Sequence, residues 1–450
     1  MEELGWATEF PSKAGYVLDK SYSFSADELR ILGKAMAVLR EQSDGDRPPA
    51  GKSAMEAVKS ACERERLPMR KDRAELVAEA MRMNLEGAGI LSKLINDEAI
   101  EEISVVGVNK PVRVFMRGRG WLETNCMLTS EEFAVNAANR LARPLGRRLT
   151  YASPRLNAGI GRMRVHASMP PLSREIEITI RKFTAEPLGI PEIIANRTVT
   201  AEAAAFLWLA CAADSSVLIA GNTGSGKTTL LNALFSFVPL GERVIVIEET
   251  PEIRVPHGHA VRMLASEELG IGMPSLVRDS LRMRPDRVVV GEVRSPEETR
   301  ALFDSLLAGQ AKAAYATFHA RSAGEALARL EALGARKNEL DAIDCIAVCM
   351  RATLFDRRER KVSETRKVVE IAEVSGGTAR QLFAVKDGGL APTKNLKASM
   401  LLERLETNYC MKRAELLEEA GARAGFLEAL AAKKQGYWRD TLEIQERMLD

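Results

Sequence analysis

Residues 221–228 contain the clearest chemical pattern in this sequence. They run Gly-Asn-Thr-Gly-Ser-Gly-Lys-Thr and match G-x-x-x-x-G-K-[ST] at every position. Glycines in such a loop let backbone N–H groups surround the β-phosphate of a nucleotide, and the N-terminus of the following helix adds a favourable dipole. The residues that we expect to bind the nucleotide are Gly221, Asn222, Thr223, Gly224, Ser225, Gly226, Lys227, Thr228 and Thr229.

The segments on both sides of this loop support the same interpretation. An apolar strand is predicted over 216–220, and a helix is predicted over 228–237. Lys227 would bridge the β- and γ-phosphates, and the Thr228 hydroxyl would bind Mg²⁺. A glycine-rich turn can match the pattern by chance, but the flanking strand and helix favour a P-loop that binds ATP with Mg²⁺.

Two further apolar segments end in carboxylates, as the metal side of a P-loop site requires. The run 288–292 is Val-Val-Val-Gly-Glu, and we predict that Glu292 completes the Mg²⁺ shell through water. The strand predicted over 243–248 is followed by Glu249 and Glu252. Several carboxylates that close are costly to bury unless a cation faces them. We predict that Glu252 orients the attacking water; the alternative is a solvated strand end with acidic capping residues.

His319 follows an apolar run and is predicted to sense the γ-phosphate, although a histidine in this position is also typical of a protein core. His257 and His259 have no further metal ligand nearby, so we expect a loop there. Cys345 and Cys349 lie within an apolar run and are expected to be packed in the core.

The elements that must position these residues alternate between strand and helix from about residue 196. This alternation predicts an α/β domain with a parallel sheet, and further strands are expected over 287–291 and 313–317. Helices are expected after the capping residues Ser295 and Ser322. The domain would span 196–450, with a helical C-terminal segment.

The preceding chain has a different pattern. Residues 1–85 look like a helical N-terminal extension, with a capping box formed by Ser25 and Glu28. Residues 86–185 predict a smaller α+β domain, with strands over 103–108, 112–116, 162–168 and 175–182. A helix should follow Thr129, which would form a capping box with Glu132. Residues 186–195 are expected to be a linker.

Composition sets broad limits on function. The chain has 450 residues, which favours two or three domains, and a net charge of +2, which does not predict direct binding of nucleic acid. Six scattered cysteines are typical of a reducing compartment. No secretory signal is recognisable, and the longest apolar run, 203–213, has eleven residues, whereas a membrane span needs about twenty. We therefore expect a soluble, cytoplasmic protein that reaches membranes through a partner.

Four segments in this order resemble the secretion ATPase superfamily of type II and type IV secretion and pilus assembly. Its Walker A loop, Asp box, Walker B strand and His box correspond to 221–228, 247–252, 288–292 and 309–319. The resemblance covers about 86–385 and is greatest to the archaeal pilus and archaellum branch and its bacterial tight-adherence relatives. It implies a RecA-like P-loop ATPase domain, ATP and Mg²⁺ as cofactors, a homo-hexameric ring, and a polytopic membrane platform protein as partner at the cytoplasmic face of the membrane.

The same resemblance implies that arginines of the N-terminal α+β domain reach the phosphates. Arg155, Arg164 and Arg181 are the candidates, and we prefer Arg164 and Arg181. Such an arginine can stabilise charge that develops on the γ-phosphate, although each is equally compatible with a structural ion pair. The sequence departs from the family at two positions, where Glu249 replaces an aspartate and Gln310 replaces the first histidine of the His box.

The main prediction is an ATP-driven motor for assembly of a pilus or secretion fibre. Within the same family, the alternative is a motor for DNA transfer or protein secretion. A nucleotide-gated regulatory module with little hydrolysis is a second alternative, encouraged by Gln310. A DNA translocase would need a basic or aromatic-lined pore, and no segment of the sequence indicates one.

Overall fold

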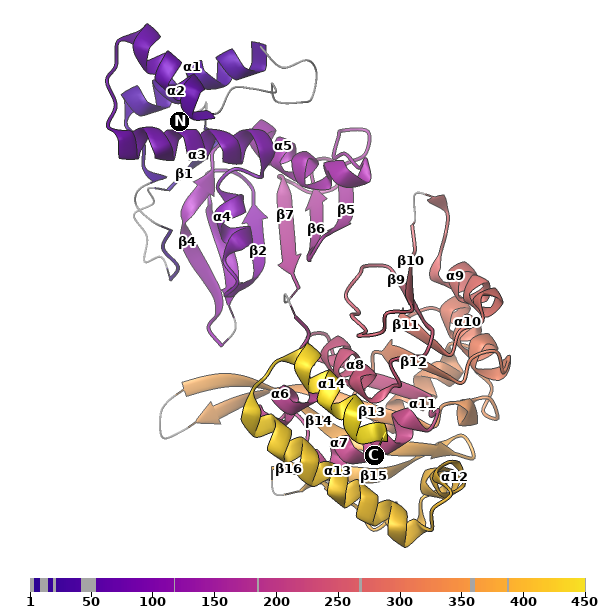
Figure 1. The fold of residues 1–450 in the computed structure, drawn as a ribbon. Helices are drawn as coiled ribbons and strands as arrows, with labels where there is room; N and C mark the ends of the chain where they lie inside the picture. The colour runs from indigo at the N-terminus through magenta and orange to yellow at the C-terminus, as the bar shows by residue number, and fades with distance from the viewer. Residues whose placement is uncertain are drawn as a thin grey trace. The chain divides into compact units, whose positions relative to one another are not determined.

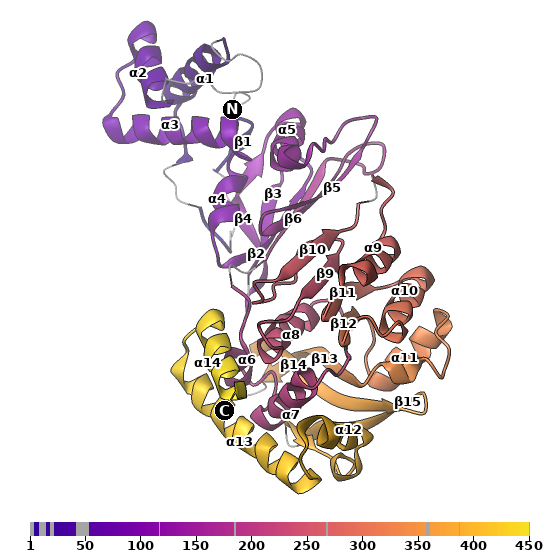
Figure 2. The same cartoon turned by 45° about the vertical axis from the view of Figure 1, so that its right-hand side comes forward.

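The computed structural model describes residues 4–8, 15–18, 22–41, 54–116, 118–183, 186–266, 269–356, 361–386 and 388–449. The chain divides into two compact units, Met1–Thr184 and Ala185–Asp450. Each unit has its own sheet (Figures 1 and 2). The buried apolar residues of the first unit form one cluster and those of the second unit form two.

The first unit combines an antiparallel sheet with five described α-helices. Its strands are β1 (Trp6–Ala7), β2 (Ile100–Val106), β3 (Pro111–Met116), β4 (Gly120–Leu128), β5 (Arg155–Ile160), β6 (Met163–Ser168) and β7 (Glu177–Lys182). Its helices are α1 (Ala26–Glu41), α2 (Ala54–Glu65), α3 (Lys71–Glu86), α4 (Leu91–Asn96) and α5 (Glu131–Ala142). The described strands are ordered β1-β4-β3-β2-β7-β6-β5, and every neighbouring pair is antiparallel.

Helices of the first 85 residues share one core with this sheet. Leu32 of α1 and Val77 of α3 are fully buried in the same cluster as Val114 and Val165 of the strands. The helical extension is therefore packed on the sheet by burial of apolar surface, which is the main favourable term in folding.

Local capping accounts for two helix starts in this unit. The Ser25 N–H donates to Glu28 Oε2 at 2.8 Å and the Glu28 N–H to Ser25 Oγ at 3.3 Å, so the capping box before α1 is confirmed. The expected cap at Thr129 is wrong. Ser130 Oγ accepts from the Phe133 N–H at 3.3 Å and caps α5, while the Thr129 N–H, which a capping box would offer to Glu132, pairs with the Gly5 carbonyl oxygen at 2.9 Å.

The second unit is an α/β fold around a mixed sheet. Its strands are β8 (Val217–Gly221), β9 (Val244–Glu248), β10 (Ala260–Leu264), β11 (Arg287–Val293), β12 (Ala313–Phe318), β13 (Cys345–Asp356), β14 (Lys361–Ser375), β15 (Thr378–Lys386) and β16 (Gly389–Pro392). Its helices are α6 (Ile190–Ala195), α7 (Ala201–Ala212), α8 (Lys227–Leu234), α9 (Met273–Ser280), α10 (Pro296–Leu307), α11 (Ala323–Ala332), α12 (Met400–Tyr409), α13 (Arg413–Lys433) and α14 (Tyr437–Leu449).

This sheet is parallel over only part of its width. Its described strands are ordered β10-β9-β11-β12-β8-β13-β14-β15-β16, and the pairs from β10 to β13 are parallel. From β13 onward the pairs are antiparallel, so the expectation of a wholly parallel sheet needs correction. For β14 and β15 the reason is their connection, because Gly376 and Gly377 have φ angles of +60° and +67°, which suit a tight hairpin rather than a helical crossover.

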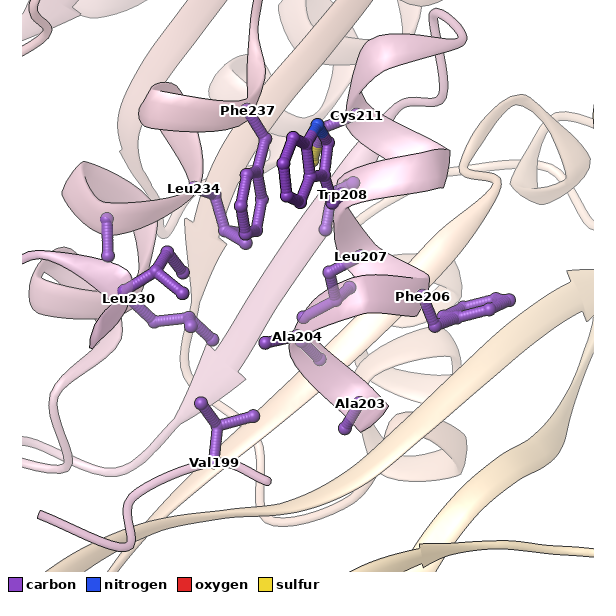
Figure 3. Packing of buried hydrophobic residues seen from close by; sticks show 14 of the residues in the cluster. Val199, Ala203, Ala204, Phe206, Leu207, Trp208, Cys211, Leu230, Leu234 and Phe237 are labelled. Carbon is purple, nitrogen blue, oxygen red and sulfur yellow. The ribbon is translucent and has the colours of Figure 1, made fainter. Parts of the chain in front are cut away.

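The second unit has two hydrophobic clusters, and one of them surrounds α7, the helix that contains the longest apolar run of the sequence. Trp208 stacks on Phe237 with ring centroids 5.1 Å apart, and Cys211 lies beside them (Figure 3). A helix that is apolar on all sides is stable only when it is buried, and α7 packs against α8 and the C-terminal helix α13. Among the described residues, no helix has the length and apolar character required to span a bilayer.

The stretch 186–195, expected to be a linker, is in part ordered secondary structure. Helix α6 occupies its second half, and Ile190 and Ile193 are buried in the core of the second unit. The sequence signal of Pro191 was misleading because proline is compatible with the first turn of a helix.

Candidate nucleotide site

Four neighbouring strands of the second unit bring the predicted site residues to one edge of the sheet. β9, β11, β12 and β8 are adjacent and parallel, so their carboxyl ends lie side by side. The P-loop follows β8, and His319 follows β12. Glu292 is near the end of β11, and Glu252 follows β9. Ligands of parallel α/β sheets bind at this edge.

Glycines are required by the backbone of the P-loop. A Cβ at Gly221 would lie 2.4 Å from the Cys349 carbonyl oxygen and 2.4 Å from Ser225 Oγ. Gly226 has a φ of +97°, which side chains other than hydrogen rarely allow. Ser225 Oγ is buried and makes no hydrogen bond to the described residues. The loop is therefore a close-packed turn with little room for larger residues.

Lys227 lies inside this loop as a buried cation. Its Nζ donates to the carbonyl oxygens of Gly221 at 3.0 Å and Asn222 at 3.2 Å, and is 3.5 Å from His319 Nδ1. Desolvation lowers the pKa of Lys227, while the negative charges of Glu292 and Glu252 oppose that shift. Both carboxylates are therefore close enough to act electrostatically on Lys227.

His319 connects Lys227 to Glu292. Its Nε2 is 2.5 Å from Glu292 Oε1, while its Nδ1 faces the lysine. Desolvation and then the charge of Lys227 lower the pKa of His319. A neutral imidazole can accept a hydrogen bond from the Lys227 ammonium at Nδ1, whereas Glu292 Oε1 is close to Nε2 without a hydrogen bond to it.

Arg294 holds the other oxygen of Glu292. One of its terminal nitrogens contacts Glu292 Oε2, and the other is 2.9 Å from Glu249 Oε2. Glu249, one of the two departures from the family, thus supplies a charge to Arg294 at the rim of the site.

Glu248 organises the segment that positions Glu252. Its Oε1 accepts hydrogen bonds from the backbone N–H groups of Glu252 at 2.9 Å and Ile253 at 2.7 Å. Asn232 of α8 binds the same segment, because its Nδ2 donates to the Glu252 carbonyl at 3.4 Å and its Oδ1 accepts from the Arg254 N–H at 2.9 Å. The P-loop helix and the segment after β9 are therefore linked directly.

Burial of Glu248 predicts a pH-dependent stability. The residue is 3% exposed, and desolvation raises its pKa to about 7. The folded state therefore holds the proton of the Glu248 carboxyl group more tightly than the unfolded chain does. The contribution of this group to the free energy of unfolding is greatest at acid pH and is lost as the pH rises through about 7. Relative to the native chain, Glu248→Gln should therefore gain stability by about 2 kcal/mol between pH 5 and pH 8.

Urea unfolding of the variant and the native chain at pH 5 and pH 8 measures this difference. Any effect of the amide on stability that does not depend on pH is the same at both pH values, so it cancels when the two are subtracted. Glu249→Gln, a change at the exposed neighbouring carboxylate, is the matched control and should follow the native pH profile. Parallel profiles for Glu248→Gln and the native chain would contradict the assignment.

The three candidate arginines belong to the first unit. Arg164 and Arg181 are directly opposite each other on β6 and β7, and Arg181 Nε is 3.9 Å from Glu102 Oε2. Arg155 is not part of this pair, because it is opposite Ser168 at the other end of the same strands. The sheet therefore brings together the two preferred arginines, and their contact with a nucleotide remains a prediction.

Gln310 is separated from the other site residues within this chain. It is exposed and precedes β12, whereas His319 follows the last residue of that strand. The departure at Gln310 consequently leaves the contacts of His319 with Lys227 and Glu292 unchanged.

The remaining histidine and cysteine candidates lie in packed surroundings. His257 is buried, with Nε2 3.1 Å from the Pro239 carbonyl oxygen, and Cys345 and Cys349 are buried in β13. Within the described ranges, no group of three His, Cys, Asp or Glu side chains is arranged to hold a metal ion. The predicted Mg²⁺ contacts are of another kind, with one hydroxyl, that of Thr228, and Glu292 through water.

Sequence reasoning missed Arg294, Asn232 and Arg366 as residues that organise the site. Arg294 had a local signal, since it lies two positions after Glu292 and directly follows β11. Asn232 and Arg366 had no local signal, because their partners lie far away in the sequence. Asn232 binds the backbone of Glu252 and Arg254, and Arg366 Nε donates to the Gly224 carbonyl oxygen at 2.9 Å from a strand more than a hundred positions away.

Comparison with known proteins extends this picture to the family level. The profile of the type II/IV secretion system protein family matches residues 145–382, a segment that includes the P-loop, the acidic strands and His319. The chain belongs to this family.

Individual relatives of this secretion-family chain differ in length and overlap. An uncharacterized protein of Methanocaldococcus jannaschii is 40% identical over 224 residues, which are 46% of this chain and 31% of that protein. A putative conjugal transfer protein of Mycobacterium tuberculosis is 35% identical over 269 residues, 57% of this chain and 75% of the relative. The type IV secretion system protein VirB11 of Bartonella quintana is 29% identical over 245 residues, 45% of this chain and 68% of the relative.

The chain spans only 31% and 54% of the two uncharacterized Methanocaldococcus jannaschii relatives that it matches with 40% and 31% identity. Among solved structures, the ATPase DotB of Legionella pneumophila aligns with a TM-score of 0.47 and 16% identity, covering 79% of this chain and 94% of DotB.

Proposed function

We propose that this secretion-family chain is an Mg²⁺-dependent ATP hydrolase that acts as a motor for assembly of a type IV-like pilus or secretion fibre. The observation that supports it best is the connected set at the sheet edge, in which His319 lies 3.5 Å from Lys227 and 2.5 Å from Glu292. A buried lysine next to glycine N–H groups suits a triphosphate, and a carboxylate across from it suits the metal.

Each residue has a distinct part in the proposed hydrolysis. Lys227 would leave the loop carbonyls and donate to the β- and γ-phosphate oxygens. Thr228, together with Glu292 through water, would hold Mg²⁺, which would supply charge neutralisation at the phosphates. Glu252 orients the attacking water and accepts its proton. His319, fixed on Glu292, responds to the γ-phosphate through Lys227.

The proposed motor is a homo-hexamer of RecA-like domains. Arg164 and Arg181 of the first unit would stabilise charge on the γ-phosphate, so that hydrolysis changes the arrangement of the units. The ring would transmit this change to a polytopic platform protein, and binding to that protein would hold the ring at the cytoplasmic face of the membrane. In this proposal the ring does not bind nucleic acid directly.

Phosphate release by the purified chain tests the activity. With ATP and Mg²⁺ we expect steady release that EDTA abolishes, and a mass measurement with ATP present should detect hexamers. Tight ATP binding without phosphate release would replace the motor with a nucleotide-gated module.

A motor for DNA transfer is the alternative. The observation that favours it is the 35% identity of this chain to the putative conjugal transfer protein of Mycobacterium tuberculosis. Hydrolysis should be compared with added single-stranded DNA and with a platform protein in lipid. Stimulation by the platform protein alone supports fibre assembly, and stimulation by DNA alone supports the alternative.

A further inference from the structure

The hairpin of β13 and β14 lies directly against the P-loop. β13 pairs with β8 in parallel as far as Cys349 opposite Gly221, and the Cys349 carbonyl oxygen is the atom that a Cβ at Gly221 would meet at 2.4 Å. This hairpin was not expected from the sequence, and the P-loop motif gives it no role. Its strand β13 therefore lies directly beside a loop that is rich in glycine.

Two arginines of this hairpin converge on the apex of the loop. Arg351 and Arg366 are opposite each other in the register of β13 and β14. Arg366 Nε donates to the Gly224 carbonyl oxygen at 2.9 Å, and its Cδ lies 3.8 Å from the position of a Cβ at Gly226. Arg351 Nη1 lies 3.3 Å from the position of a Cβ at Gly224.

We propose that Arg366, with Arg351 beside it, is a positioning residue that holds the P-loop in the conformation that binds phosphate. The Gly224 carbonyl and the Ser225 N–H belong to one peptide group. The Ser225 N–H donates to the Asn222 carbonyl oxygen at 3.2 Å, and a charged donor on the Gly224 carbonyl polarises this peptide and so strengthens that bond, which closes the turn of the loop. This inference rests on the proposed nucleotide site and adds a contact made by the chain's own distant hairpin.

The contacts of Lys227 explain why a second cation is needed. Lys227 holds the carbonyls of Gly221 and Asn222 at the start of the loop, and it must leave them to reach the phosphates. Gly224 and Gly226 have φ angles of +72° and +97°, and a glycine without restraint populates positive and negative φ about equally, so contacts from outside the loop are needed to fix this conformation. Arg366 then remains as the cation on the loop backbone, and it reduces the ordering entropy that nucleotide binding must overcome.

Equilibrium binding of a fluorescent ADP analogue to the full chain tests this role without any need for hydrolysis. Arg366→Gln should raise the Kd about tenfold, since a hydrogen bond from a charged group is lost and the loop is less ordered. If the native chain hydrolyses ATP, KM should rise to a similar extent and kcat should change much less. Arg366→Lys should recover part of the affinity, because it keeps the charge but not the fork geometry.

Lys367→Gln is the matched control. Lys367 is the next residue of β14, on the opposite face of the strand, and its Nζ donates to the Gly388 carbonyl oxygen at 2.9 Å. The control should bind the analogue as the native chain does.

The inference is overturned if Arg366→Gln binds within twofold of the native chain, or if Lys367→Gln loses as much affinity. If Arg366→Gln does not fold, Arg366→Lys decides: weaker binding at an unchanged melting temperature supports the positioning role, and unchanged binding overturns it. A native chain that binds ADP but releases no phosphate would contradict the proposed function while leaving this test valid.

Discussion

Replacement of Lys227 by alanine should abolish ATP turnover, with a loss of at least about a hundredfold in kcat/KM. Lys227 is the buried cation of the P-loop, 9% exposed, and the charges of Glu292 and Glu252 act on it. Without the ammonium, the charge that develops on the β- and γ-phosphate oxygens loses its nearest protein partner. Steady-state phosphate release at saturating Mg²⁺ measures the effect.

A control is needed because Lys227 also binds the loop carbonyls. Lys312→Ala removes a lysine that precedes β12, where it contacts Glu242 at 2.7 Å at the other end of that strand. We expect this variant to retain turnover within about threefold, as is usual for changes outside a catalytic site. Near-normal hydrolysis by Lys227→Ala would refute the site assignment.

Glu252→Gln should bind ATP and fail to hydrolyse it, which is the second large effect. The backbone of Glu252 is held by Glu248 and Asn232, so the amide can occupy the same place as the carboxylate. An amide still accepts a hydrogen bond from water but cannot take its proton, and general-base catalysis contributes about 10²–10⁴ in rate. Retention of radiolabelled ATP on the protein after gel filtration, with no ADP formed, is the expected readout.

Glu292→Gln is the comparison that assigns the two carboxylates. Glu292 contacts both His319 and Arg294, so its neutral variant should weaken Mg²⁺-dependent binding and leave less ATP trapped than Glu252→Gln does. If Glu292→Gln gives the tighter trap, the two roles are exchanged and Glu292 is the residue that activates water.

Features of this protein that are formed by residues close together in the sequence could be predicted from the sequence alone. A P-loop is a contiguous turn whose geometry is dictated by its glycines, and capping boxes are formed by residues three positions apart. Ser295 and Glu298, for example, exchange hydrogen bonds of 3.1 and 3.2 Å at the start of α10. The strands that carry Glu248 and Glu292 at or near their carboxyl ends were also predictable, because buried parallel strands are continuous apolar runs.

Contacts between distant segments were decided only by the tertiary structure. Strand order brings His319 against Glu292, and no local pattern encodes that order. Arg366 reaches Gly224 because the β13–β14 hairpin extends the sheet beside the P-loop, whereas an arginine in a strand has no sequence signal for its partner. The ligand-binding loop is therefore a local property of the sequence, while the charges that surround it are a property of sheet topology.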